Sequence, residues 1–197
     1  KGILLSEEQI TEEIARAMLI QAAQQEALPE KFRAQAYLRI AELAATHNER
    51  DTVLQNLAKI SAASPAVDKN VVRRMTTLYL QLKEKNRARE ILTLYRENHK
   101  AESEVDYTLF RLYALDLKDF KAAAKLCAKV NWKEKVPEKY GLNCARIFAA
   151  VNDFPAALEL IDGYIARKGN ATEKQVSELR ENIVRKRGKF EPNEADF

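Results

Sequence analysis

The sequence is poor in the residues that break helices. Only five of its 197 residues are glycine and five are proline, roughly 5% together, where average usage is about 12%. Aromatic residues make up 8% of the chain, and it has one tryptophan. Few breakers mean few turns and long elements, so the composition disfavours a β-sandwich or barrel, which needs a turn every ten residues or so.

The chain also lacks the residue patterns of catalytic and metal sites. Its two histidines, His47 and His99, have no Cys, His or acidic residues at metal-ligand spacing. No glycine-rich phosphate loop, dinucleotide fingerprint, H-E-x-x-H helix or nucleophile elbow occurs. We therefore predict a protein that is not an enzyme, with no catalytic residue, no metal site and no cofactor.

Long hydrophobic runs are missing, and charge of one sign is only in slight excess. No stretch of about 18 uncharged apolar residues occurs, so we predict no membrane span. The 33 Lys and Arg against 29 Asp and Glu give a net charge of +4, less than dedicated nucleic-acid binders usually carry. Part of the excess lies in Arg180–Lys189. This segment is either the solvated end of a last helix or a patch for an anionic partner.

The two cysteines, Cys127 and Cys144, fall on apolar helical faces. We interpret them as buried thiols, because a free cysteine behaves as a small hydrophobe. A disulfide is the alternative and would imply an oxidising compartment. Since the sequence begins with Lys1 and not Met, we expect a fragment or processed product. The compartment stays unknown: the cytoplasm is slightly favoured, or the periplasm or cell envelope if an upstream signal peptide was removed.

What the sequence has in abundance is helix-forming residues. Ala, Leu, Glu, Lys and Arg dominate, with 46% hydrophobic and 31% charged residues overall, which predicts an all-helical soluble protein. Hydrophobic periodicity and Pro29 predict helices over about 6–27, 30–46 and 51–62. On the first of these, Ile10, Ile14 and Met18 share one face.

A sequence repeat organises the rest of the chain. Asp119-Phe120 followed by Ala122-Ala123 recurs 34 residues later as Asp153-Phe154 and Ala156-Ala157. Counting back from Ala157 in steps of 34, 35 and 35 reaches Ala123, Ala88 and Val53. The first helices of the resulting helix pairs begin near Ala34, Lys69, Glu104 and Glu138, and a further unpaired helix begins near Thr172. A fixed period with two helices per unit predicts a stacked solenoid, with the small residues at the closest helix–helix approach.

This pattern resembles a divergent tetratricopeptide (TPR)-like repeat family. The matching positions are Tyr37 and Tyr107 for the first aromatic, Tyr79 and Phe148 for the later one, Phe120/Ala123 and Phe154/Ala157 on the second helices, and Pro65 at a unit's end. One departure is Arg111, which stands where other units have the small residues Ala41, Thr76 and Ala145 and puts normal packing there in doubt.

The resemblance implies an all-α fold, a right-handed α-solenoid of about four TPR-like helical hairpins with capping helices at both ends. We expect an N-terminal helix packing on the array over 1–28 and the repeats within 29–171. The expected boundaries are 34–67, 69–102, 104–137 and 138–171 for the repeats, 172–190 for the C-terminal capping helix and 191–197 for a tail.

In TPR-like arrays the first helices line a concave face that binds a peptide or helix of another protein. The resemblance places the following residues on that face: Asn70, Arg73, Thr77, Val105, Thr108, Leu112, Lys139, Leu142, Arg146, Val176 and Arg180. The net charge of this set is positive, so it favours a partner with acidic groups or a C-terminal carboxylate. The spacing of the five-residue carboxylate clamp of TPR co-chaperones is absent, so chaperone-tail binding does not carry over.

The resulting hypothesis is a non-catalytic scaffold or adaptor for protein–protein interaction. One alternative is an RNA-binding helical-repeat protein, resting on the pI near 9.0 and the basic Arg180–Lys189 segment. Another is a positioning domain of a larger export or assembly machine. The first helix either caps the solenoid or pairs with a second copy as a homodimer.

Overall fold

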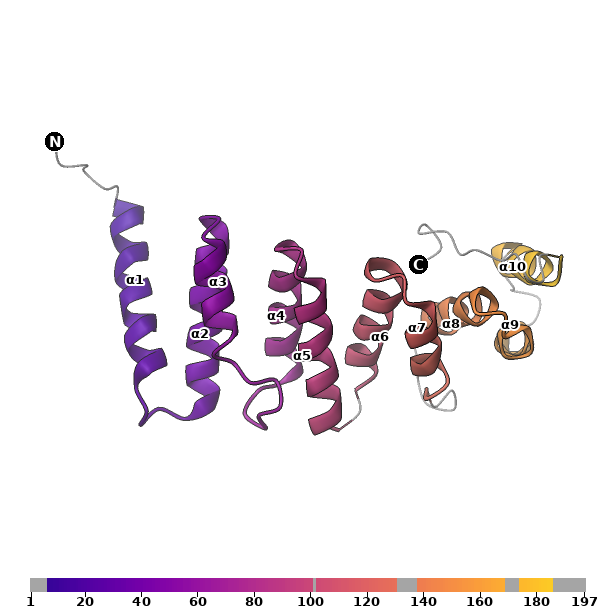
Figure 1. Cartoon of the computed structure of the whole chain (residues 1–197), viewed down its shortest axis with the longest axis horizontal. Helices are drawn as coiled ribbons and strands as arrows, with labels where there is room; N and C mark the ends of the chain where they lie inside the picture. The colour runs from indigo at the N-terminus through magenta and orange to yellow at the C-terminus, as the bar shows by residue number, and fades with distance from the viewer. Residues whose placement is uncertain (1–6, 101, 131–137, 169–173, 186–197) are drawn as a thin grey trace. The chain divides into compact units, whose positions relative to one another are not determined.

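The computed structural model describes residues 7–100, 102–130, 138–168 and 174–185, which contain ten α-helices, one π-helical turn and no strand (Figure 1). No described helix is both long enough and apolar enough to cross a membrane. The chain divides into two compact units, Lys1–Ala101 (unit 1) and Glu102–Phe197 (unit 2). Each unit is described by itself.

Unit 1 consists of one helix followed by two helical hairpins. Its helices are α1 (Glu7–Gln24), α2 (Glu30–Thr46), α3 (Arg50–Leu57), α4 (Lys69–Gln81) and α5 (Lys85–Asn98). α2 packs on α3 and α4 packs on α5, and the first helices of the two hairpins, α2 and α4, are also in contact. The helix predicted over 30–46 is confirmed to the residue. The helix predicted over 6–27 is described from Glu7 and ends at Gln24, and the helix predicted over 51–62 begins at Arg50 and ends at Leu57.

Unit 2 consists of two helical hairpins, the first with one irregular helix, followed by a single helix. Its elements are α6 (Ser103–Arg111), the π-helical turn η1 (Leu112–Asp116), α7 (Phe120–Cys127), α8 (Glu138–Ala150), α9 (Phe154–Lys168) and α10 (Lys174–Arg185). α6 and η1 pack on α7, α7 packs on α8, α8 packs on α9, and α9 packs on α10.

The turn inside each hairpin has the same backbone conformation. Asn48, Lys83, Lys118 and Asn152 are the described non-glycine residues with positive φ, at 59°, 62°, 51° and 66°. They lie 35, 35 and 34 residues apart, which is the spacing of the sequence repeat. A left-handed residue that ends a helix lets the next N–H return to a helix carbonyl, so the turn chemistry recurs with the period of the units.

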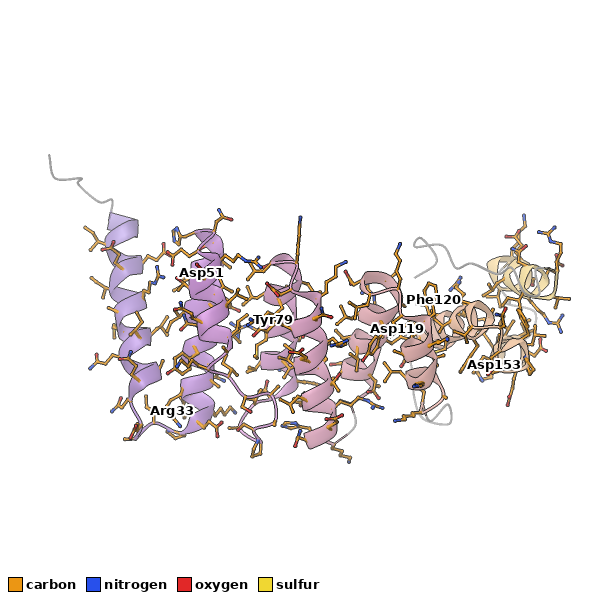
Figure 2. The ribbon with its side chains drawn as sticks, in the orientation of Figure 1. Arg33, Asp51, Tyr79, Asp119, Phe120 and Asp153 are labelled. Carbon is orange, nitrogen blue, oxygen red and sulfur yellow. A yellow bond between two sulfur atoms is a disulfide. The ribbon has the colours of Figure 1, made fainter. Side chains whose placement is uncertain are left out.

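The residue after each left-handed position is acidic and begins the second helix. The carboxylate Oδ1 of Asp119 accepts from the backbone N–H of Ala122 at 2.9 Å, and that of Asp153 accepts from Ala156 at 3.3 Å. Figure 2 shows both aspartates at the starts of α7 and α9. These helix caps explain why the Asp-Phe pair recurs in the sequence.

The small residues that define the repeat lie in the core, as predicted. Val53, Ala88, Ala123 and Ala157 are each 0% exposed. On the first helices, Ala41 and Ala145 are also 0% exposed and Thr76 is 2% exposed. Two helices can approach closely only where such a side chain lies between them.

Arg111 breaks this pattern, and the backbone changes at that point. Arg111 is exposed, while Phe110 is 0% exposed. The next residue begins the π turn, in which the N–H of Leu117 bonds the carbonyl of Leu112 at 3.0 Å. The N–H of Asp119 therefore reaches back six residues to Tyr113, where the other turns reach back five. The wider turn directly follows the exposed arginine and the buried Phe110.

α1 packs on α2 with only one of its faces. Ala23, Leu19 and Ala22 of α1 lie against Ala36 and Ile40 of α2, with Tyr37 alongside. The other face, with Ile10, Ile14 and Met18, is 46%, 57% and 66% exposed. The apolar face predicted from periodicity is therefore the uncovered one.

Ion pairs connect α1 and α3 each to the turn at the end of the next first helix. Arg16 of α1 makes a two-point contact with Glu49, in the turn after α2. Arg50 of α3 contacts Glu84 at 2.5 Å, in the turn after α4. α1 is therefore placed relative to the first hairpin, α2 and α3, in the same way as α3 is placed relative to the second hairpin, α4 and α5. In this comparison, Met18 of α1 corresponds to Val53 of α3, which lies 35 residues later. Val53 is fully buried within the hairpin of α2 and α3.

The interpretation of Cys127 and Cys144 as free thiols is wrong. The two are joined in a disulfide, with Cα atoms 5.6 Å apart and both residues 0% exposed. The bond connects the end of α7 to the middle of α8. Burial alone was a poor guide because facing positions of two packed helices suit a cystine as well as two thiols.

Candidate functional site

The first helices of unit 1, α2 and α4, form an open hollow of about 520 Å³ between them. It is lined by Glu42, Ala45, Thr46, Arg73, Arg74, Thr77, Leu78 and Gln81. Arg73 and Thr77 are two of the residues that the resemblance placed on a binding face. The hollow therefore brings predicted site residues together with others that the sequence did not indicate.

One side of the hollow is closed by an ion pair. Arg74 donates from Nε and Nη2 to the two carboxylate oxygens of Glu42, at 2.6 and 2.5 Å, and Arg39 adds a third contact at 3.2 Å. Burial alone would raise the pKa of Glu42, but the hydrogen bonds from Arg74 and Arg39 outweigh it and lower the pKa. Glu42 is thus an anion whose charge neutralises that of Arg74.

Arg73 provides the uncompensated charge of the hollow. Its side chain is exposed, and its guanidinium forms no ion pair with any residue that the structure describes. The lining holds one carboxylate and two guanidinium groups, so its net charge is +1. A guanidinium without an ion-pair partner favours a planar anion that can accept two parallel hydrogen bonds.

The remaining lining residues offer hydrogen bonds and an apolar surface. The hydroxyl of Thr77 donates to the backbone carbonyl of Arg73 at 3.0 Å, so toward a ligand it presents its lone pairs. Gln81 is exposed and carries an amide that both donates and accepts. Leu78 and Ala45 supply apolar wall between these groups. The combination suits a short peptide with one acidic group.

Asn70 lies on the same face of α4, one turn before Arg73, but does not line the hollow. It is exposed, and its backbone N–H donates to Asp68, which caps α4. The face predicted from α4 therefore exists as a stripe of Asn70, Arg73 and Thr77, of which the last two meet α2.

In unit 2 the predicted residues come from α6, η1, α8 and α10 and differ in their exposure. Thr108 is half-buried, with its hydroxyl donating to the carbonyl of Glu104 at 2.8 Å. The prediction for Leu112 is wrong as a surface residue: it is 2% exposed and continues the buried helix face of Val105 and Leu109, which are 6% and 2% exposed. Leu142 is half-buried on α8, and the side chain of Lys139 lies outside the described residues.

The two predicted arginines of unit 2 contact neighbouring side chains. Arg146 donates to the amide oxygen of Asn143 at 2.8 Å. Arg180 makes a two-point contact with Asp162, at 2.7 and 3.3 Å, and this hydrogen bond raises the pKa of Arg180. Among the described residues, the hollow beside Arg180 is lined by side chains of α10. Lys186, Arg187 and Lys189 of the basic segment lie outside the described residues.

Asn143 is a buried polar residue that the sequence analysis missed. It is 0% exposed, and its amide approaches the hydroxyl of Tyr107 at 3.5 Å. Tyr107, Phe110 and Tyr140 form an aromatic cluster with ring centroids 4.9 to 6.0 Å apart. The signal that could have found Asn143 is an amide inside the apolar stripe of α8.

The two histidines make local contacts. His47 lies 2.6 Å from a carboxylate oxygen of Glu12 on α1. His99 stacks on Tyr95, and its ring nitrogens lie 3.0 and 3.1 Å from the carbonyls of Tyr95 and Ser64. Within the described ranges, no group of three or more His, Cys, Asp and Glu side chains is placed to hold a metal ion.

Comparison with known proteins gives the fold and nothing finer. No protein-family model matches the sequence, and no curated protein matches it significantly. The chain is similar to the crystal structure of MamA, a TPR-repeat protein, with a TM-score of 0.52 over 77% of this chain and 86% of that one. The fold is TPR-like. The predicted all-α solenoid class is therefore confirmed, and at 17% sequence identity the likeness extends to the fold alone.

Proposed function

We propose that the protein is a non-catalytic interaction scaffold that binds an acidic segment of a partner protein in the α2/α4 hollow. The observation that carries this proposal is the exposed Arg73 guanidinium in a hollow whose other charges, Glu42 and Arg74, neutralise each other. The TPR-like fold supports the general class of protein interaction, because repeat arrays present extended binding surfaces.

The chemistry of the hollow defines the partner more closely. Arg73 would bind a carboxylate, either an Asp or Glu side chain or a chain terminus. Thr77 and Gln81 would bind backbone N–H and C=O groups next to it, and Leu78 would contact an apolar side chain. At about 520 Å³ the hollow is within the usual size range of ligand sites.

An RNA partner has less support from the described residues. Arg180, which begins the basic segment, makes its two-point contact with Asp162. Arg185 in the same segment donates to Asn182 at 2.8 Å. RNA binding is therefore included as an alternative outcome of the binding test described next.

The test is a fluorescence polarisation assay with labelled eight-residue peptides. One pool ends in Asp or Glu with a free carboxylate, and the comparison pool has Lys at those positions and an amidated end. We expect binding of the acidic pool alone, and a loss of at least tenfold in affinity for Arg73→Glu. Lys59→Glu makes the same charge change at an exposed position outside the hollow and should retain binding.

Three results would contradict the proposal. The two pools could bind equally, or neither could bind. Arg73→Glu and Lys59→Glu could also weaken binding to the same extent, which would indicate a diffuse charge effect. Salt-sensitive binding of a mixed-sequence labelled RNA, with no binding of acidic peptides, would establish the nucleic-acid alternative instead.

A further inference from the structure

The repeat assigns an equivalent position to Cys127 in every hairpin. Cys127 lies four residues after Ala123, at the inner face of a second helix. The residues four after the corresponding small positions are Leu57, Leu92 and Ile161, which are 0%, 1% and 0% exposed. The other units therefore fill this position with a large aliphatic side chain.

Cys144 also has equivalents. It directly precedes the small residue Ala145 on the first helix α8. The residues that precede Ala41 and Thr76 are Ile40 and Met75, which are 2% and 0% exposed. Here too the other first helices place a large apolar side chain in the core.

The junction between a second helix and the next first helix can therefore be compared within the chain. In unit 1, α3 packs on α4, and the two equivalent positions hold Leu57 and Met75. In unit 2, α7 packs on α8, and the positions hold Cys127 and Cys144. A cysteine side chain has half as many heavy atoms as leucine or methionine, so two thiols would leave the second junction short of apolar contact.

We propose that the Cys127–Cys144 disulfide replaces this apolar contact and holds the α7–α8 junction together, so that the protein folds and works in an oxidising compartment. The bond joins residues 17 apart in sequence and so restricts the unfolded chain around the junction. Both residues are fully buried, which is typical of a structural disulfide and not of one that exchanges during function. Unit 1 contains no cysteine, so only unit 2 depends on redox conditions.

Reduction would act at this bond alone. A dithiol reductant would supply two electrons and two protons, the S–S bond would break, two S–H bonds would form, and the reductant would become a disulfide. The chain has only these two cysteines, so any effect of a dithiol on the folded protein reports on the α7–α8 junction.

The first experiment counts thiols. Source cells are lysed directly into denaturant that contains excess iodoacetamide, so that buried thiols are alkylated as well, and the full chain is then analysed by mass spectrometry. We expect no alkylated cysteine without reduction and two alkylated cysteines after it. Two alkylated cysteines without reduction would overturn the proposal, because the chain would then be reduced where it works.

The second experiment measures thermal unfolding with and without dithiothreitol. We expect the melting temperature of unit 2 to fall on the order of 10 °C on reduction. The matched variant Cys127→Leu/Cys144→Met copies the α3–α4 junction and should be insensitive to the reductant. Equal melting temperatures of the wild type in both conditions would overturn the proposal.

A third measurement does not depend on the variant folding. Hydrogen exchange of the wild type with and without reductant should show faster exchange in α7 and α8, and unchanged exchange in α2 to α5. Faster exchange across both units, or in neither, would contradict a role confined to this junction.

Discussion

The repeat predicts that a larger side chain at Ala88 lowers the stability of the protein. Ala88 is 0% exposed on α5, at the small position that the repeat predicts for the closest approach of α4 and α5. Ala88→Leu adds three carbon atoms to a fully buried site, and overpacking of this kind costs about 1–3 kcal/mol. For a domain the size of unit 1, each kcal/mol lowers the melting temperature by about 4–8 °C. We therefore expect a fall of roughly 4 to 24 °C.

The control is Met18→Leu, at the corresponding position of α1. Met18 is 66% exposed, so the change should alter the free energy of unfolding by no more than about 0.5 kcal/mol. The assay is thermal unfolding followed by circular dichroism, supported by urea titration to obtain the free energy. An Ala88→Leu variant as stable as the wild type would refute the close approach at this position. A large loss for Met18→Leu would refute the uncovered face of α1.

Three further predictions concern turns, caps and pH. Lys83→Gly should raise the free energy of unfolding by about 0.5–1 kcal/mol in urea titration, because lysine at φ 62° strains the backbone more than glycine does. Asp119→Ala should lower it by about 1 kcal/mol in the same assay, through loss of the α7 cap. The hydrogen bond from Arg16 lowers the pKa of Glu49 from 4.5 to about 2. The stabilisation from this pair should therefore be complete above pH 4.5 and lost as the pH falls toward 2, which NMR titration of the Glu49 carboxyl would measure.

Much of the fold could be predicted because the repeat fixes it locally. Breakers such as Pro29 set helix ends, and the recurring small residues identify the core positions Ala88, Ala123 and Ala157. The left-handed turn residues were not singled out from the sequence, although their 35-residue spacing follows the repeat. Asn and Lys at these sites carry no local signal as strong as glycine would.

The features that could not be predicted depend on how one helix faces another. Periodicity identifies the apolar face of α1 with Met18, but not whether another helix covers it. Composition identifies Cys127 and Cys144 as apolar-face residues, but their pairing requires the relative register of α7 and α8. Arg111 predicted irregular packing at its position in the repeat. It did not predict the π turn that directly follows it.

The candidate site was predicted in part for the same reason. The resemblance gave positions on single helices, so it found Arg73 and Thr77 on α4. It could not find Glu42 of α2, whose importance comes from its contact with Arg74 across the helix pair. Among the described residues, the hollow combines Arg73, which makes no ion pair, with the neutralised pair of Glu42 and Arg74. This combination depends on the tertiary contact between α2 and α4.

The central claim is that the α2/α4 hollow binds an acidic peptide through Arg73. Its most direct test is a two-dimensional ¹H–¹⁵N NMR titration of the oxidised full chain with an eight-residue peptide ending in Glu, repeated with the peptide that ends in an amidated Lys. We expect shift changes at Arg73, Thr77 and Gln81 with the acidic peptide only, and we expect these changes to be abolished in Arg73→Glu. Shift changes confined to other helices, or none at millimolar peptide, would contradict it.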